Sequence, residues 1–170
     1  MKLRIFSDLH LEYAPLREPF VIPEANVCVV AGDLCRGPAN GVRWLVEYIA
    51  PTMPCVYVAG NHDFYRGSVR EGIEEGRRAA REFPNVHFLE NEMVTIGGVT
   101  FIGATLWTDY RIEGDKLLAM RHARMDDDRQ IAFQRKHWQR FVPEAATRMH
   151  QESRRFIEWN AGPLQSAGVR

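Results

Sequence analysis

The stretch Gly60-Asn61-His62-Asp63 follows an apolar run at residues 55–59, and two comparable stretches, Asp8-Leu9-His10 and Gly32-Asp33, follow runs at 3–6 and 27–31. The runs are short and rich in Val, Ile and Phe, which is typical of buried strands. Because ligands bind at the carboxyl ends of the strands in open α/β sheets, the three stretches are expected to converge. The sequence therefore predicts a pocket rich in metal-binding side chains.

Helical patterns separate these runs. Residues 40–49 and 68–83 carry apolar side chains at helical spacing, and Ser68 with Glu71 forms a capping-box pattern at the start of the second segment. Right-handed crossovers then place the three strands in one parallel sheet whose faces the helices cover. The fold class predicted up to this point is α/β.

The pattern changes after Pro84. Residues 86–89, 93–96 and 99–103 read as short strands of an antiparallel patch, and Gly97-Gly98 predicts a tight hairpin. Residues 114–142 contain a polar stretch that we interpret as a lid or excursion, whereas 143–159 has helical spacing and 162–170 reads as a connector. We expect residues 1–170 to form a single α/β domain.

Composition excludes several classes of protein. The 170 residues carry 22 basic and 22 acidic side chains, and this balance argues against a strong nucleic-acid footprint. No apolar run approaches the length of a membrane span, so we expect a cytoplasmic protein with no membrane partner. Cys28 and Cys55 lie within strand runs and are expected to be buried thiols, while Cys35 has no paired base nearby.

The side chains at the strand ends suit a metal centre. Residues two apart on a strand face the same way, so Asp8 and His10 can contact one ion together. Asp33 can bridge two cations through its two oxygens, and Asn61 would add a neutral oxygen to the second ion. This mixture of donors suits Mn, Fe or Zn better than Ca.

His62 and Asp63 fit a catalytic role. Adjacent residues in a turn diverge, so His62 can face the substrate and donate a proton to a leaving or phosphoryl oxygen while Asn61 faces the metal. Asp63 would orient the imidazole through a hydrogen bond. Phosphoryl transfer needs charge neutralisation and an activated water, and a metal-activated hydroxide supplies the nucleophile without Ser or Cys.

In this order and spacing, the three stretches resemble the motifs of the calcineurin-like metallophosphoesterases. The segment from Gly103 to Asp109 is similar to a bacterial subgroup of that family. The resemblance implies an αββα sandwich and hydrolysis of a phosphate monoester or diester. It also implies Asp8, His10, Asp33 and Asn61 as metal ligands and His62 as the catalytic histidine.

The chain departs from the family pattern at its C-terminal end. Family members continue with a further metal-binding His and a Gly-His-x-His block, and neither follows before Arg170. The first metal would keep Asp8, His10 and Asp33, whereas the second would keep only Asp33 and Asn61. We therefore expect a C-terminally truncated domain with one bound metal, or two if a partner subunit completes the site.

Simpler interpretations exist for each feature. The Asp and Asn side chains could serve only turn and capping chemistry, and His62 with Asp63 could be a structural pair. Trp107 and Asp109 could line the pocket. However, an aromatic side chain at a strand end belongs more often to the core. The run at residues 126–128 is three consecutive aspartates, which usually form a solvated surface.

Two classes of function remain open at this point. One is a phosphoesterase acting on a small-molecule phosphoester. The other is a non-catalytic remnant that binds at most one metal and acts as an oligomerising or binding module. If part of the second sheet is absent, an apolar face is left uncovered, and we therefore expect a homo-oligomer such as a dimer.

Overall fold

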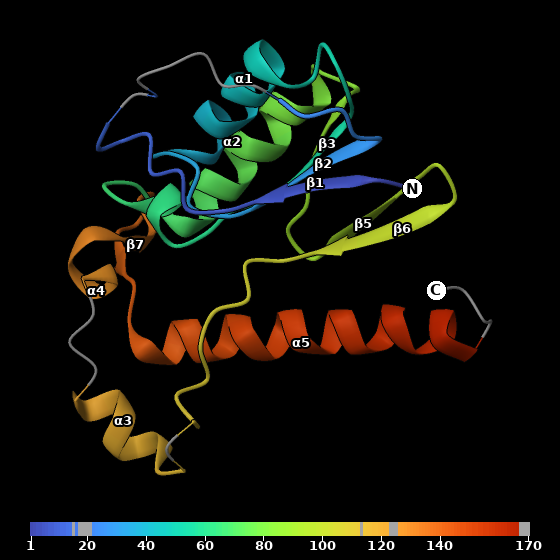
Figure 1. Ribbon diagram of the computed structural model, residues 1–170. Helices are drawn as coiled ribbons and strands as arrows, with labels where there is room; N and C mark the ends of the chain where they lie inside the picture. Colours follow the sequence, from blue (N-terminus) through green and yellow to red (C-terminus); the bar gives the residue numbers. More distant parts are fainter. Residues whose placement is uncertain (15, 17–21, 113, 123–125, 167–170) are drawn as a thin grey trace.

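A parallel sheet of four strands forms the centre of the computed structural model, which describes residues 1–14, 16, 22–112, 114–122 and 126–166, without the side chains of 163–166 (Figure 1). The strand order is β1-β2-β3-β4. The register sets Cys28 of β2 opposite Cys55 of β3, and both thiols are free and buried as expected. The strand bounds are β1 Leu3–Phe6, β2 Val27–Ala31, β3 Cys55–Val58 and β4 Val86–Phe88.

Strand β4 corrects the expectation that the chain becomes antiparallel directly after Pro84. It pairs with β3 in parallel, with Cys55 opposite Val86 and Tyr57 opposite Phe88. The connection from β3 to β4 contains a complete helix, which is the kind of crossover that parallel pairing requires. The alternating pattern of β4 reflects its position at the edge of the sheet.

Helices α1 (Pro38–Tyr48) and α2 (Val69–Arg81) pack against each other on the same face of this sheet, and not on both faces (Figure 1). Their buried side chains include Val42, Leu45 and Val69. Gly76 allows α2 to approach α1 closely, because a Cβ there would meet Cβ of Pro38 at 2.9 Å. Gly72 and Gly76 also leave room for Phe64 and Phe88, each of which a Cβ would meet at 2.9 Å. This packing forms the larger hydrophobic core.

The start of α2 differs from a capping box. Ser68 occupies the N-cap position with extended backbone, but its hydroxyl makes no bond to a helix N–H. It donates instead to the carboxylate of Glu71. That carboxylate also accepts the backbone N–H groups of Arg135 and Lys136 at 3.0 Å each, so Glu71 connects α2 to a distant loop.

The opposite face of the sheet is covered by the hairpin of β5 (Glu92–Ile96) and β6 (Val99–Gly103). Gly97 and Gly98 have φ angles of 56° and 79°, as the predicted tight turn requires. The long helix α5 (Pro143–Ser166) lies beyond the hairpin and contacts β6. The layers therefore follow the order helix, sheet, sheet, helix, in agreement with the expected αββα sandwich.

The segment between the hairpin and α5 has two different halves. Helix α3 (Lys116–His122) has no buried residue among those described. In contrast, Ile131 and Phe141 are buried in the main core. Gln130 accepts the N–H of Arg66 at 2.8 Å, so the second half packs beside the site. It contains α4 (Asp127–Gln130), β7 (Ala132–Gln134) and β8 (Gln139–Arg140).

Helix α5 also corrects the expected connector at 162–170. Its backbone stays helical through Gly162 and Pro163 to Ser166, and residues 167–170 lie outside the described part. Pro163 removes the hydrogen bond to the carbonyl of residue 159, but Trp159 is 80% exposed, so water can satisfy that carbonyl. None of the described helices has the length and apolar character needed to span a membrane.

Candidate metal centre

The loops that follow β1 and β2 run side by side and bring the predicted residues together. The N–H of Asp8 donates to the carbonyl of Gly32 at 3.1 Å, and the N–H of His10 donates to that of Asp33 at 3.0 Å. Asp8, His10 and Asp33 have φ angles of 58°, 47° and 53°, a left-handed conformation that costs energy for residues other than glycine and that often occurs at functional sites.

These left-handed residues replace the strand alternation expected for Asp8 and His10. Strand β1 ends at Phe6, so the two side chains do not share a face of an extended strand. They still approach each other, since the Oδ1 atom of Asp8 lies 3.8 Å from Nε2 of His10. The two side chains therefore lie near each other as the sequence predicts, but the backbone reaches this arrangement through a loop of left-handed residues.

Three side chains form a cluster that could hold a metal ion. Each of His10, Asp33 and His62 offers one ligand atom, and these atoms all lie within 4.8 Å of one another. Asp8 lies at the edge of the cluster with a side chain that is 65% exposed. Two imidazoles beside carboxylates match the donors that first-row transition metals prefer, so the residues present fit a divalent ion.

The carboxylate of Asp33 is held in place by the loop after β3. Its Oδ1 atom accepts the backbone N–H of His62 at 2.9 Å. The N–H of Asp33 donates in turn to Oδ2 of Asp63 at 2.8 Å. Two strand ends are therefore joined by reciprocal bonds, and the 3₁₀ turn of His62–Phe64 starts at the site.

Asp63 has partners other than the expected imidazole of His62. Its buried carboxylate accepts bonds from the hydroxyl of Tyr57 and from the N–H groups of Gly60 and Asp33. Burial raises the pKa of Asp63 to about 6, although these hydrogen bonds act in the opposite direction. In this geometry, Asp63 fixes the backbone that carries the site.

Glu12 stands where Asp63 was expected. Its Oε1 atom lies 3.2 Å from Nδ1 of His10 and 3.0 Å from Nδ1 of His62, and only 3% of its side chain is exposed. Burial raises its pKa, but the net shift is downward because its own N–H and the two imidazoles stabilise the carboxylate. No role for Glu12 is predicted from the sequence, although a carboxylate two residues after His10 could have indicated a contact with its ring.

Asn61 is oriented by a residue of the excursion. Its amide nitrogen donates to Oδ1 of Asp127 at 2.8 Å. This bond fixes the orientation of the amide and leaves its oxygen for another contact. The same Oδ1 atom accepts the hydroxyl of Tyr65 at 2.8 Å. Asp127 is only 6% exposed, so the expectation of a solvated aspartate run is wrong at this position. Asp126 is exposed, as expected.

Aromatic rings enclose the histidines. His62 stacks on Tyr65 with centroids 4.1 Å apart, and its ring meets that of His10 edge-on at 4.4 Å.

Trp107 is buried against Phe141 at 4.5 Å, which places it in the core. Cys35 is an inert thiol, because burial and the nearby carboxylates raise its pKa to about 12.

One cavity lies beside the loop after β3. It has a volume of about 250 Å³ and is lined by Asp63 and Tyr65, and it also carries charged side chains, namely Arg36, Arg66, Arg135 and Glu75. Arg135 pairs with Glu75 at 3.8 Å, so two of these charges compensate each other.

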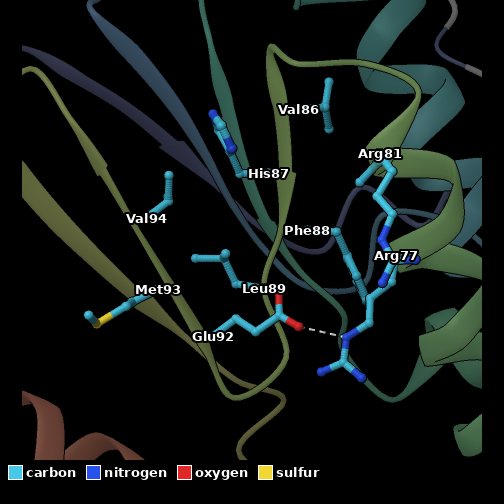
Figure 2. Close-up of a pocket in the computed structure, with 10 residues that line it drawn as sticks. Arg77, Arg81, Val86, His87, Phe88, Leu89, Glu92, Met93 and Val94 are labelled. Carbon is cyan, nitrogen blue, oxygen red and sulfur yellow. Dashed lines mark ion pairs between the residues drawn. The ribbon is translucent and has the colours of Figure 1, made fainter.

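A second cavity of about 250 Å³ lies beside the edge strand β4 (Figure 2). Arg77 crosses it and pairs with Glu92 at 2.7 Å, which ties α2 to the hairpin. Arg81 and His87 also line this cavity, but none of the predicted site residues does. This cavity is therefore separate from the cluster of His10, Asp33 and His62.

Comparison with solved structures shows the same fold in a larger protein. The chain is similar to a phosphopantetheinyl hydrolase from Mycobacterium tuberculosis, with a TM-score of 0.64 and 18% identity. The match covers 92% of this chain and 63% of that one. At this identity, the likeness concerns the fold.

Sequence comparison reaches the family. An uncharacterized protein, L509, of Acanthamoeba polyphaga mimivirus is 27% identical over an alignment of 124 residues that covers 63% of this chain and 44% of that protein. The chain thus spans less than half the length of this relative. The profile of the calcineurin-like phosphoesterases matches residues 1–154. The chain with its strand-end cluster of His10, Asp33 and His62 therefore belongs to the calcineurin-like phosphoesterase family.

Proposed function

We propose that this protein hydrolyses a small-molecule phosphate monoester or diester with the help of a divalent cation. Asp8, His10 and Asp33 would hold the first ion, and the cluster of His10, Asp33 and His62 is the observation that carries the proposal. Family membership supports the reaction class. The cation, for which we propose Mn, Fe or Zn, would neutralise phosphoryl charge and lower the pKa of a coordinated water.

His62 would handle protons at the substrate. One face of its ring is covered by Tyr65, and its Nδ1 atom is occupied by Glu12. When the ring is an imidazolium, its Nε2 atom is then the nitrogen that can donate to a leaving oxygen or to a phosphoryl oxygen. His62 is also a candidate metal ligand because it belongs to the cluster. For a role in proton transfer, its Nε2 atom would have to face the substrate.

Asn61 would provide an oxygen for a second ion. The bond from its amide nitrogen to Asp127 holds the amide, and Asp33 lies on the neighbouring strand end. These two residues supply fewer donors than the first site has. A second ion is therefore proposed to bind more weakly, unless a partner subunit supplies further ligands.

The experiment measures hydrolysis of bis(p-nitrophenyl) phosphate and of p-nitrophenyl phosphate by purified protein with Mn²⁺ and after chelator treatment. Metal-dependent turnover is expected, with a loss of about 10²–10⁴-fold in kcat for His62→Gln. Asp126→Asn changes an exposed aspartate and is expected to keep wild-type turnover. Turnover that survives chelation, or that is equal in the His62 variant, contradicts the proposal.

A second candidate function is that of an oligomerising module, supported by the outer face of β1. Leu3 and Ile5 are 40% and 60% exposed, and they point away from Phe6, which packs into the main core. Because β1 is an edge strand, a second copy could cover this face. Light scattering at micromolar concentration is expected to show a dimer that Ile5→Lys dissociates, whereas a wild-type monomer contradicts this candidate.

A further inference from the structure

The histidines of the candidate centre share one carboxylate oxygen. Oε1 of Glu12 lies 3.2 Å from Nδ1 of His10 and 3.0 Å from Nδ1 of His62. The two rings meet edge-on with their centroids 4.4 Å apart. Since a carboxylate only accepts hydrogen bonds, each Nδ1 atom that contacts it must carry a proton.

This arrangement decides which nitrogen of each ring is free. A neutral imidazole carries one proton, so a proton on Nδ1 leaves a lone pair on Nε2. For His10, the Nε2 atom is the one that faces Asp8, at 3.8 Å from Oδ1. The nitrogen of His10 that carries the lone pair therefore lies near the carboxylate with which it would share a cation.

We infer that Glu12 is a positioning residue that holds His10 and His62 together in the tautomer whose Nε2 atom is free. It acts through the two rings and contacts neither substrate nor the reacting atoms. Metal-binding histidines generally donate their second ring N–H to a carboxylate or carbonyl, and the shared oxygen does this for two rings at once. The inference rests on the proposed function where it concerns the cation, but the tautomers can be measured without one.

A purely structural role explains Glu12 poorly. Its side chain is 3% exposed, and its Oε2 atom has no hydrogen-bond partner among the described residues. A buried carboxylate with one unpaired oxygen weakens a fold more than a neutral side chain of similar size does. Its two imidazole contacts are therefore what favours a carboxylate at this position.

Glu90 offers a matched control. The whole residue is 3% exposed, its Oε1 atom lacks a partner among the described residues, as Oε2 of Glu12 does, and its Oε2 atom accepts the N–H of Thr105 at 2.8 Å. Within the described part of the chain, it forms no hydrogen bond or ion pair with either histidine of the centre. Glu90→Gln therefore changes a buried carboxyl without touching the two rings.

The test records long-range ¹H–¹⁵N spectra of the histidine rings in chelator-treated protein. The signals of His10 and His62 are assigned by their loss in His10→Gln and His62→Gln. Wild-type protein is expected to show both rings with a protonated Nδ1. In Glu12→Ala, both rings should lose this single tautomer together, and Glu12→Gln, which keeps an acceptor oxygen, should restore part of it.

A titration with Mn²⁺ gives a second readout. Loss of such an outer partner lowers metal affinity by about 10–100-fold, and Glu12→Ala is expected to show a decrease of that size, while Glu90→Gln should bind as wild type does. The inference is overturned if both ring signals of folded Glu12→Ala match those of the wild type. This holds even if the wild-type protein hydrolyses the phosphoester substrates. If the tautomers change as expected but no phosphoester is hydrolysed, the proposed function fails and the role of Glu12 stands.

Discussion

Gly60 and Asp33 lie so close together that no side chain fits between them. A Cβ atom built on Gly60 would come within 2.2 Å of Oδ1 of Asp33 and 2.7 Å of its backbone nitrogen. The Asp33 carboxylate can therefore occupy this position only because Gly60, on the neighbouring strand end, has no side chain. This contact explains physically why a glycine begins the stretch of residues 60–63.

Gly60→Ala is therefore expected to displace the Asp33 carboxylate. Overpacking of this kind costs about 1–3 kcal/mol of unfolding free energy, and the bound metal should decrease with it. Urea unfolding and elemental analysis measure the two effects. Gly162→Ala is the control for metal content, because a Cβ there meets nothing within 4 Å outside its two chain neighbours. Wild-type metal content in Gly60→Ala would show that the close contact does not place the carboxylate.

The bond between Asp127 and Asn61 leads to a second prediction. Asp127→Ala leaves the Asn61 amide and the Tyr65 hydroxyl without their shared acceptor, which should cost about 1–3 kcal/mol of unfolding free energy. If Asn61 is a ligand of a second ion, that ion should bind more weakly, while the first binds as before. Tyr65→Phe removes only the hydroxyl bond and should keep both affinities. Titration calorimetry with Mn²⁺ separates the variants, and an unchanged weaker site in Asp127→Ala would exclude a role for this bond.

Glu71 predicts a dependence of stability on acid. Burial raises the pKa of its carboxyl, but the bonds from Lys136, Ser68 and Arg135 outweigh this and lower the pKa from 4.5 to about 2. A carboxyl whose pKa is lower in the folded state stabilises that state above pH 4.5, and this contribution disappears as the pH falls toward 2. Glu71→Gln should therefore be less stable than wild type near neutral pH, by roughly 0.5–1 kcal/mol because solvent screens the group.

Unfolding curves between pH 7 and pH 2 measure this contribution. The difference between wild type and Glu71→Gln should be constant above pH 4.5 and should shrink below it. Glu74→Gln changes an exposed carboxylate on the same helix and should show no such change with pH. A gap that widens in acid would contradict the assignment.

The sequence predicts the strands that consist of a short apolar run. Strands β1, β2 and β6 have the predicted bounds, since each is a short apolar run with a polar or glycine end. Asp8, His10, Asp33 and Asn61 are predicted as site residues because they follow such runs, and the structure brings His10 and Asp33 into one cluster. Pairing direction was harder, and β4 joins the parallel sheet although its sequence resembles an edge hairpin.

The missed contacts are those that depend on tertiary packing. Glu12 and Asp127 reach His62 and Asn61 across 50 and 66 residues of sequence. No local pattern specifies such a pair, and a run of three aspartates ordinarily indicates a solvated surface. Asp63 is the converse case, because it is adjacent to His62 in sequence but contacts Tyr57, Gly60 and Asp33.

Metal stoichiometry measured by elemental analysis, on protein dialysed against Mn²⁺, tests the central claim most directly. At least one ion per chain is expected in the wild type and in Asp126→Asn. In Asp33→Asn, the content should fall far below one, because the variant loses the carboxylate that lies in the cluster with His10 and His62. An equal metal content in Asp33→Asn and wild type, with both proteins folded, would contradict a metal centre at these strand ends.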